Sequence, residues 1–225
     1  MLEADIIIFD CDSTLTRIEG IDELAKRANV QEQLVPLTTA AMEGDMRLED
    51  VYKHRLELIR PALTEIDWLG QQYIKDVVHD AKPVIHALQK LGKQVHIVSG
   101  SVRQAVMQLA DYLGISADCV NAVEIYFDQN GNYRGFDESS PLGRSGGKKM
   151  VCAELIGSTR RGVIIGDGIT DYEAIQERLV FIGFGGVVQR EKLRQLADHY
   201  VTEPSLRPVL DILFTKYQLQ NLNLV

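Results

Sequence analysis

The chain has 225 residues, 45% of them hydrophobic, and a formal net charge of −8 at pH 7. This length fits one large domain or a domain with an insertion, and the hydrophobic fraction is ordinary for a globular protein. The acidic balance argues against a general nucleic-acid binder, which would carry a basic stripe.

The first predicted element is a buried strand over residues 5–10, DIIIFD, which ends beside two carboxylates one residue apart. Near-continuous apolar strands are typical of a parallel sheet covered on both faces. Asp10 and Asp12 close this strand, and residues two apart in a strand project the same way. Such a pair of like charges strongly raises one pKa unless a cation neutralises it, which favours a Mg²⁺ site.

The long stretch before the next strand has only helical patterns, at residues 20–29, 35–46, 47–60 and 64–74. Helices inserted after the first strand would form a small bundle over the sheet. We therefore expect a helical cap at residues 17–79 and an α/β core at residues 1–16 and 80–225. Hinges of this cap should lie just after Thr16 and near Asp80.

The rest of the chain alternates strands with helices. Strands are predicted at residues 94–100, 162–168, 179–186 and 199–202, and helices at residues 82–92, 101–114, 146–157 and 189–199. This alternation predicts an α/β protein with an open, doubly wound, mostly parallel Rossmann-like sheet. Residues 124–136 interrupt it with an alternating pattern around Asn130-Gly131, a strong signal for a β-hairpin flap.

The cysteines and histidines exclude further classes. Three scattered cysteines with no CxxC pair favour a reduced, cytoplasmic protein over a disulfide scaffold. The five histidines do not pair at metal-ligand spacing, which argues against a histidine-based zinc site. The opening MLEAD has no basic segment, and the apolar run after it is too short for a signal or membrane span. We expect no nucleic-acid or membrane partner, and either a monomer or a homodimer.

Polar residues follow several predicted strands at what should be one edge of the sheet. Beyond Asp10 and Asp12, this edge should gather a hydroxyl, a backbone amide, a lysine and two more carboxylates: Ser99, Gly100, Lys148, Asp167 and Asp171. In open α/β sheets, ligands bind beyond the carboxyl ends of the strands. These groups are the ones that a metal–phosphate site needs.

Each of these residues also has a simpler interpretation. An Asp-x-Asp can be a solvated turn, Ser99 a helix cap, Lys148 a surface lysine, and Asp167 with Gly168 a turn. Their coincidence at successive strand ends argues against all of these interpretations holding together.

These segments resemble the haloacid dehalogenase superfamily, whose motifs occur in the same order. They read DCDST at 10–14, VSG at 98–100, GGK at 146–148 and GDGITD at 166–171. The resemblance covers almost the whole chain and is closest to the phosphoserine phosphatase branch. Three more segments carry that likeness: FDCDSTLTRIEGIDELA at 9–25, HRLELIRP at 54–61 and FIGFGGVVQRE at 181–191.

The resemblance implies a Mg²⁺-dependent phosphomonoesterase of L-serine biosynthesis that hydrolyses O-phospho-L-serine. Asp10 would be the nucleophile that forms an aspartyl-phosphate, and Asp12 would be the general acid and base. Asp10, the main-chain carbonyl of Asp12 and Asp167 would hold the metal. Asp171 would orient Lys148 or a metal-bound water.

The resemblance also implies the groups that bind the substrate. Ser99, Gly100 and Lys148 would bind the phosphoryl oxygens. Glu19 would meet the substrate ammonium and Arg55 its carboxylate, which a guanidinium can bind through two parallel hydrogen bonds. The remaining expected substrate contacts are Met42, Ser101 and Thr170. Alone, Glu19 would be interpreted as a first-turn acid of a helix and Arg55 as a solvated arginine.

The chain departs from the family pattern at two places. Ser101-Val102 follows Gly100, where the family often has Gly-Phe, and Glu43 follows Met42, where a glycine is expected. A serine restricts the backbone where glycine would allow close approach to a ligand. These departures leave phosphatase chemistry intact and put the exact substrate in question.

Other functions fit the sequence less well. FIGFGG before a helix is only a partial dinucleotide fingerprint, because Val188 takes its third glycine position. GRSGGKK is not a P-loop, because Lys149 stands where serine or threonine must follow the lysine. A non-catalytic binding module would be expected to lose Asp10 or Lys148. The alternative that remains is a phosphatase or phosphotransferase of the same superfamily acting on another small phosphorylated metabolite.

Overall fold

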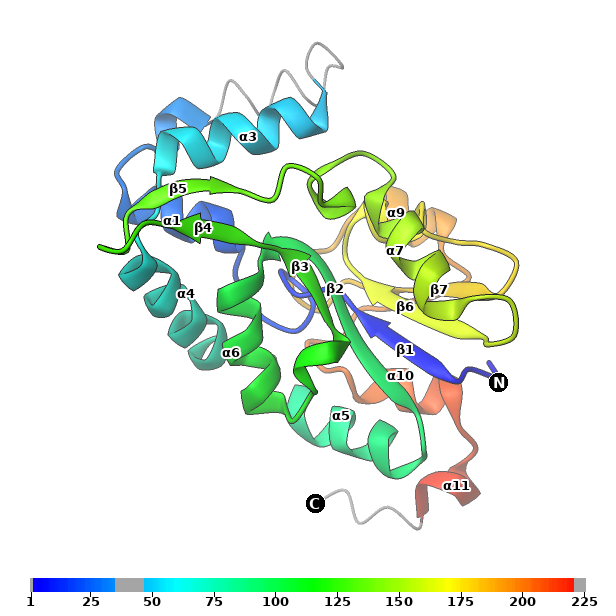
Figure 1. The fold of residues 1–225 in the computed structure, drawn as a ribbon. Coiled ribbons are helices and arrows are strands. Elements are labelled where there is room, and N and C mark those ends of the chain that lie inside the picture. The colour runs from blue at the N-terminus through cyan, green and yellow to red at the C-terminus, as the bar shows by residue number, and fades with distance from the viewer. Residues whose placement is uncertain (1, 35–46, 221–225) are drawn as a thin grey trace.

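A six-stranded sheet lies at the centre of the computed structural model, which describes residues 2–34 and 47–220 (Figure 1). Its strand order is β3-β2-β1-β6-β7-β8, and every neighbouring pair is parallel. The strands are β1 (Ile6–Phe9), β2 (Gln94–Val102), β3 (Val120–Val123), β6 (Gly162–Gly166), β7 (Leu179–Phe184) and β8 (His199–Val201). The expected doubly wound α/β fold is confirmed.

Helices cover both faces of the sheet because its central strands are apolar on both sides. Within β1, Ile7 and Phe9 join one core cluster, whereas Ile6 and Ile8 join the other. The first cluster packs under α5 (Ala81–Lys90), α6 (Arg103–Leu113) and α10 (Arg207–Leu213). The second packs under α7 (Gly147–Ile156), α8 (Ile169–Tyr172) and α9 (Glu191–Leu196), and α11 (Lys216–Gln220) follows near the C-terminus.

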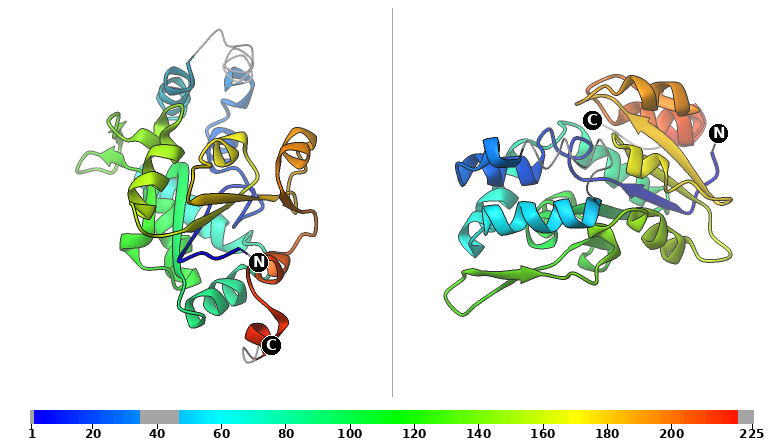
Figure 2. Two further views of the ribbon diagram at one scale, coloured as in Figure 1. Left: turned by 90° about the vertical axis from the view of Figure 1, so that its right-hand side faces the viewer. Right: turned by 90° about the horizontal axis from the view of Figure 1, so that it is seen from above.

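The segment between β1 and β2 is helical in its described part. It contains α1 (Gly20–Arg27), α3 (Leu48–Ile59) and α4 (Leu63–Lys75), which match the helices expected at 20–29, 47–60 and 64–74. Figures 1 and 2 show α1 and α3 on the side towards which β1 runs. The helix expected at 35–46 lies outside the described residues, and the cap boundaries at 17–79 stay a prediction.

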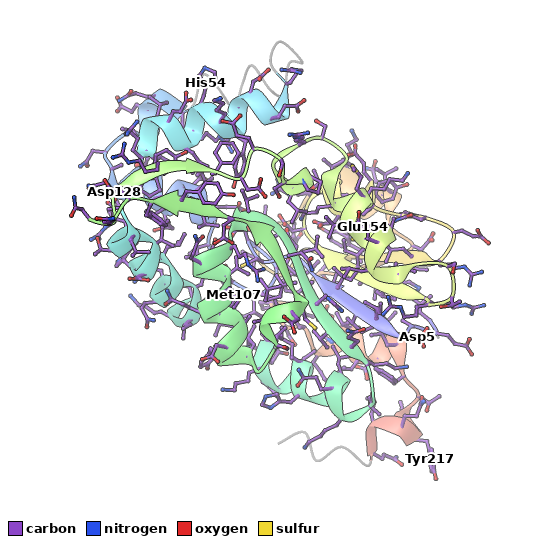
Figure 3. The ribbon with its side chains drawn as sticks, viewed as in Figure 1. Asp5, His54, Met107, Asp128, Glu154 and Tyr217 are labelled. Carbon is purple, nitrogen blue, oxygen red and sulfur yellow. The ribbon has the colours of Figure 1, made fainter. Side chains whose placement is uncertain are left out.

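The expected hairpin is present as the antiparallel pair β4 (Ile125–Phe127) and β5 (Tyr133–Phe136). Asp128 organises the turn, since its carboxylate accepts hydrogen bonds from the amides of Asn130 and Asn132, each at 2.9 Å. Gly131 has φ +78°, a left-handed conformation that glycine adopts without strain. Figure 3 shows Asp128 at the tip of this hairpin, and α3, which carries His54, lies alongside.

The second strand is longer than its sequence pattern predicts. We expected a strand at 94–100 and a helix from 101, but β2 runs to Val102 and α6 begins at Arg103. A register shift between Val98 and Val102 lets Val102 pair with Val123 of β3, so Ser99 and Gly100 lie within the strand at this irregularity. The helix expected at 189–199 is likewise shorter, because His199 begins β8.

Several elements have no counterpart among the expectations. They are β3, α8, α10, α11 and the 3₁₀ turns Ala117–Cys119 and Pro141–Gly143. All are short, and a short apolar run has too few residues to show the helical or the strand repeat of apolar positions. Within residues 2–34 and 47–220, no helix is long and apolar enough to cross a bilayer.

His96 is a polar residue inside the sheet. It pairs in register with Ile8 and is 4% exposed, and neither ring nitrogen has a hydrogen-bond partner within the described part of the chain. Burial, followed by the charge of Arg160, lowers the pKa of His96 below its ordinary value of 6.5. Protonation therefore favours the unfolded chain, and stability is lost as pH falls below that value.

We expect His96→Leu to raise the free energy of unfolding by about 1–3 kcal/mol, because it removes buried polar atoms without partners. The gain should be larger at pH 5 than at pH 8, since the variant no longer loses stability through protonation of this ring. Urea denaturation at both pH values measures the effect, with the exposed His86→Leu as the matched control. A destabilised His96→Leu would mean that the ring is paired in solution.

Candidate active site

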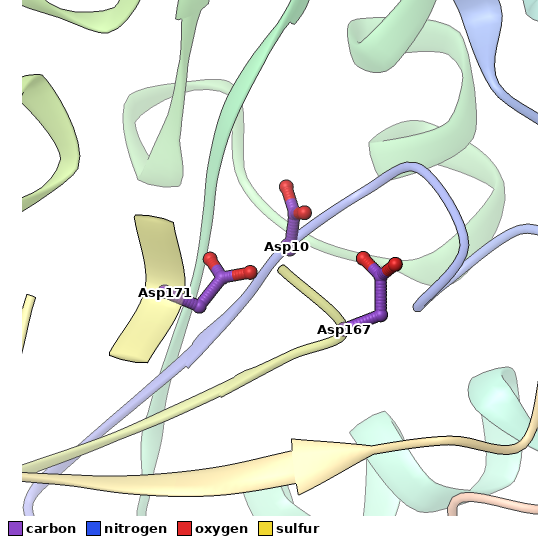
Figure 4. Close-up of side chains that lie close together, drawn as sticks. All are labelled: Asp10, Asp167 and Asp171. Carbon is purple, nitrogen blue, oxygen red and sulfur yellow. The ribbon is translucent and has the colours of Figure 1, made fainter. Parts of the chain in front are cut away.

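Three carboxylates meet where β1 and β6 end. The two strands are parallel neighbours with Phe9 in register with Ile165, so Asp10 and Asp167 leave the sheet side by side. The Asp10 amide donates to the Ile165 carbonyl at 2.9 Å, which fixes this arrangement. Asp171 comes from α8, one turn further on, and its side chain points to the same place (Figure 4).

Lys148 lies between two of these acids. Its Nζ is 2.9 Å from Asp10 Oδ1 and 2.6 Å from Asp171 Oδ1. Burial opposes the charged lysine more than any other single influence, yet Asp10 and Asp171 together raise the pKa of Lys148 above its ordinary range. The lysine thus remains charged in the buried site.

Glycine allows α7 to present Lys148 at its first turn. A Cβ atom on Gly147 would lie 1.7 Å from the Pro141 carbonyl oxygen, so only glycine fits beneath the Pro141–Gly143 turn. Gly146 caps the helix with φ +73°, which is also a conformation that favours glycine. The sequence GGK therefore positions the lysine through close backbone packing.

The carboxylates exceed the positive charge available from Lys148. Ligand oxygens of Asp10, Asp167 and Asp171 lie within 4.8 Å of one another, and all three residues are buried. Burial and the charge of Asp10 raise the pKa of Asp167, although Arg190 opposes this. Burial also raises the pKa of Asp171 to about 7, against the opposing charge of Lys148. Buried acidic oxygens that repel one another fit a hard divalent cation, which would remove this cost.

Asp12 and Glu19 form a second pair of acidic side chains, close enough to Asp10 for its charge to act on Asp12. Burial, then the charges of Glu19 and Asp10, raise the pKa of Asp12 well above its ordinary range. Burial also raises the pKa of Glu19, whose Oε1 accepts a hydrogen bond from Ser13 Oγ at 2.6 Å. Ser13 has φ +52°, so a strained residue turns the chain between these two acids.

These groups border a cavity of about 290 Å³. Its lining includes most of the residues expected from the sequence: Asp10, Asp12, Glu19, Arg55, Ser99, Gly100, Ser101, Lys148 and Thr170. Asp167 and Asp171 are not part of that lining and lie buried beside Asp10. Met42, the remaining expected contact, and Glu43 lie outside the described residues.

Sequence reasoning missed some residues of the site. Arg190 binds Asp167 Oδ2 through Nη2 at 2.8 Å and Nε at 3.1 Å, and it also donates to the Asp167 carbonyl at 3.0 Å. Tyr52 and Arg144 line the cavity. Arg190 follows FIGFGG closely, but a single arginine after a glycine-rich turn has no spacing that links it to Asp167.

The chain resembles known proteins in sequence. Residues 4–177 match the family described as haloacid dehalogenase-like hydrolase. Phosphoserine phosphatase of Rattus norvegicus is 37% identical over 202 residues, which cover 89% of this chain and 90% of the rat protein. The chloroplastic phosphoserine phosphatase of Arabidopsis thaliana is 32% identical, with 86% of this chain and 67% of the plant protein covered.

Solved structures agree in fold. A phospho-aspartyl intermediate analogue of phosphoserine phosphatase superposes with a TM-score of 0.74 at 25% identity, covering 95% of this chain and all of that one. A phosphoserine phosphohydrolase-like protein from Francisella tularensis gives a TM-score of 0.78 at 24% identity, covering 93% of this chain and all of that one.

We expect a divalent cation to stabilise the folded protein through the three clustered carboxylates. Magnesium chloride at 100 times its dissociation constant should add about 2.7 kcal/mol. Asp167→Asn should abolish most of the resulting rise in melting temperature, whereas Asp118→Asn, at an exposed position outside the cluster, should retain it. Thermal denaturation with and without the salt measures the shift. An equal shift in both variants would place the cation elsewhere.

Proposed function

The chain belongs to the haloacid dehalogenase-like hydrolase family, and we propose that it hydrolyses O-phospho-L-serine to L-serine and phosphate, with Mg²⁺ as its cofactor. One observation carries this proposal. A single small cavity combines the Asp10–Lys148 pair with an acid, Glu19, and a guanidinium, Arg55, on its walls, where Glu173 and Arg144 also lie. The similarity to phosphoserine phosphatases over 89% of the chain supports the same conclusion.

The reaction we propose proceeds in two displacements. A carboxylate oxygen of Asp10 attacks phosphorus, the bond from phosphorus to the seryl oxygen breaks, and the carboxyl proton of Asp12 passes to that oxygen. Water then attacks the aspartyl-phosphate and gives its proton to Asp12, which releases phosphate and restores Asp10. The raised pKa of Asp12 suits the first step, because an acid must hold its proton near neutral pH.

Other residues would reduce the repulsion between the Asp10 carboxylate and the phosphate of the substrate. Lys148 offsets the charge of Asp10 and can contact a phosphoryl oxygen, while Asp171 holds the lysine in place at 2.6 Å. The Ser99 hydroxyl and the Gly100 amide are the proposed donors to the remaining phosphoryl oxygens. Asp10, the Asp12 carbonyl and Asp167 would hold Mg²⁺, which supplies positive charge to the nucleophile and phosphate when bound.

Selectivity should come from the groups that cover the phosphate site. Glu19 complements an ammonium and Arg55 a carboxylate, which are the two charges of a free amino acid. Ser101 and Thr170 also line the cavity and are proposed to complete the contacts. A ligand that lacks either charged group would forgo one of these two contacts, and that loss provides discrimination. The rival substrates are other small phosphorylated metabolites.

Two further expectations belong to this proposal. Residues 17–79 would form a cap that closes on the core, and the antiparallel bridge of Thr16 with Val77 brings the two connecting segments together. Asp80 would anchor the second segment, since it accepts a hydrogen bond from the Leu206 amide at 3.0 Å. The cytoplasmic location is supported by the free thiols of the three cysteines.

Asp10→Asn should lower phosphoserine turnover by about four orders of magnitude or more, because an amide is a poor nucleophile. Phosphate release with Mg²⁺ measures the rate, and circular dichroism checks that the fold is retained. A panel of phosphorylated metabolites assayed with the wild-type protein tests the substrate. Wild-type turnover in the variant would remove Asp10 from the nucleophile role.

Arg55→Ala should reduce kcat/KM for phosphoserine by about 10- to 100-fold, the cost of losing a charged hydrogen bond. Turnover of p-nitrophenyl phosphate, which has no carboxylate, should change far less. Arg47→Ala, at an exposed arginine that precedes the same helix, is the matched control. Equal losses for the two substrates would show that Arg55 does not read the carboxylate.

A further inference from the structure

A chain of buried hydroxyl groups connects the helical segment to the reacting carboxylates. Tyr73, in α4, is fully buried, and its hydroxyl lies 2.5 Å from Ser101 Oγ in β2. Gly20 makes room for it, because a Cβ atom at that position would lie 1.9 Å from the tyrosine oxygen. Tyr73, Ser101 and Gly20 are thus fitted to one another at the wall of the site.

This chain of hydroxyls ends on Asp12. Hydrogen bonding by the Tyr73 side chain and the Gly20 backbone opposes the rise in the pKa of Asp12, whereas Asp12 Oδ1 has no hydrogen-bond partner within the described part of the chain. A tyrosine hydroxyl carries one proton, so when it donates to Asp12 the Ser101 hydroxyl must donate to Tyr73. The carboxyl group is therefore held in place while its Oδ1 atom has no hydrogen-bond partner among the described residues.

Ser101 also acts on its neighbour in the strand. Its amide donates to Ser99 Oγ at 3.1 Å, at the irregular part of β2. Since that bond occupies an acceptor position of the Ser99 oxygen, the hydroxyl proton stays available to an incoming acceptor. One residue thus orients both the phosphate-binding serine and, through Tyr73, the acid.

We propose that Tyr73 and Ser101 are positioning residues that hold the Asp12 carboxyl group in the orientation for proton transfer to the leaving oxygen. This inference rests on the proposed function, because it needs a phosphate ester whose alcohol must be protonated. Tyr73 remains a hydrogen-bond donor throughout and gives up no proton to the substrate. Through Tyr73, helix α4 would therefore contribute to the proton transfer by Asp12 in the core.

A purely structural role for Tyr73 makes a different prediction. Loss of packing would slow all substrates alike, whereas loss of acid orientation matters most for a poor leaving group. An alkyl alcohol needs protonation as it departs, and a nitrophenolate needs little. For two esters that both lack an ammonium and a carboxylate, the ratio of kcat/KM therefore reports orientation of the acid, since kcat/KM excludes the later hydrolysis of the aspartyl-phosphate.

The test compares ethyl phosphate with p-nitrophenyl phosphate, both assayed with Mg²⁺, because neither ester has the ammonium and carboxylate that Glu19 and Arg55 are proposed to bind. Tyr73→Phe should lower kcat/KM for ethyl phosphate by about tenfold and that for the aryl ester by less than about threefold. Ser101→Ala should show the same pattern with a smaller loss, and the double variant should match Tyr73→Phe because the two residues act as one unit. Asp12→Asn supplies the full leaving-group effect for reference.

Tyr133→Phe is the matched control, since Tyr133 is also buried but does not line the cavity. It should leave both rates unchanged. Equal losses for the two esters, or no loss in either variant, would overturn the proposal, and Ser101→Ala decides the matter if Tyr73→Phe fails to fold. If the wild type prefers another alkyl phosphate over phosphoserine, the substrate proposal fails, while the comparison of ethyl phosphate with the aryl ester still tests the positioning role.

Discussion

Electrostatic repulsion among carboxylates is the constraint on which the rest of the site depends. Asp10, Asp167 and Asp171 lie within 4.8 Å of one another in a buried place, where like charges are costly. Lys148 offsets part of that cost through contacts of 2.9 and 2.6 Å, and Arg190 offsets part of it at Asp167. The remaining excess of negative charge fits a hard divalent cation, which would remove part of that cost.

Backbone geometry delivers these charges to one point. Parallel pairing of β1 with β6 puts Asp10 beside Asp167 without any contribution from side-chain contacts. The irregular register of β2 places Ser99 and Gly100 inside a strand and beside the cavity. Gly147 lets the start of α7 approach the Pro141–Gly143 turn closely enough for Lys148 to reach the acids. The fold thus sets where the charged and polar groups lie. The irregular register of β2 and the close approach at Gly147 then set the final geometry of the site.

The helical segment after β1 also supplies side chains to the site. It carries Glu19 and Arg55, two of the charged groups on the cavity wall, and also Tyr73, whose hydroxyl lies 2.5 Å from Ser101 Oγ of the sheet. Under the proposed roles, recognition of the substrate and orientation of Asp12 would depend on the same packing between helices and sheet.

The sequence by itself determined the fold class, every strand of the central sheet except β3, and the residues that gather at the carboxyl edge. Apolar strands, helix periods and motif order are local properties, so Asp10, Lys148 and Asp167 could be selected from their positions after strands or at a helix start. Only the tertiary structure decided the extension of β2 to Val102, the Arg190–Asp167 pair and the bond between Tyr73 and Ser101. Each of these joins segments far apart in the chain or depends on a register shift, and neither leaves a periodic signal in the sequence.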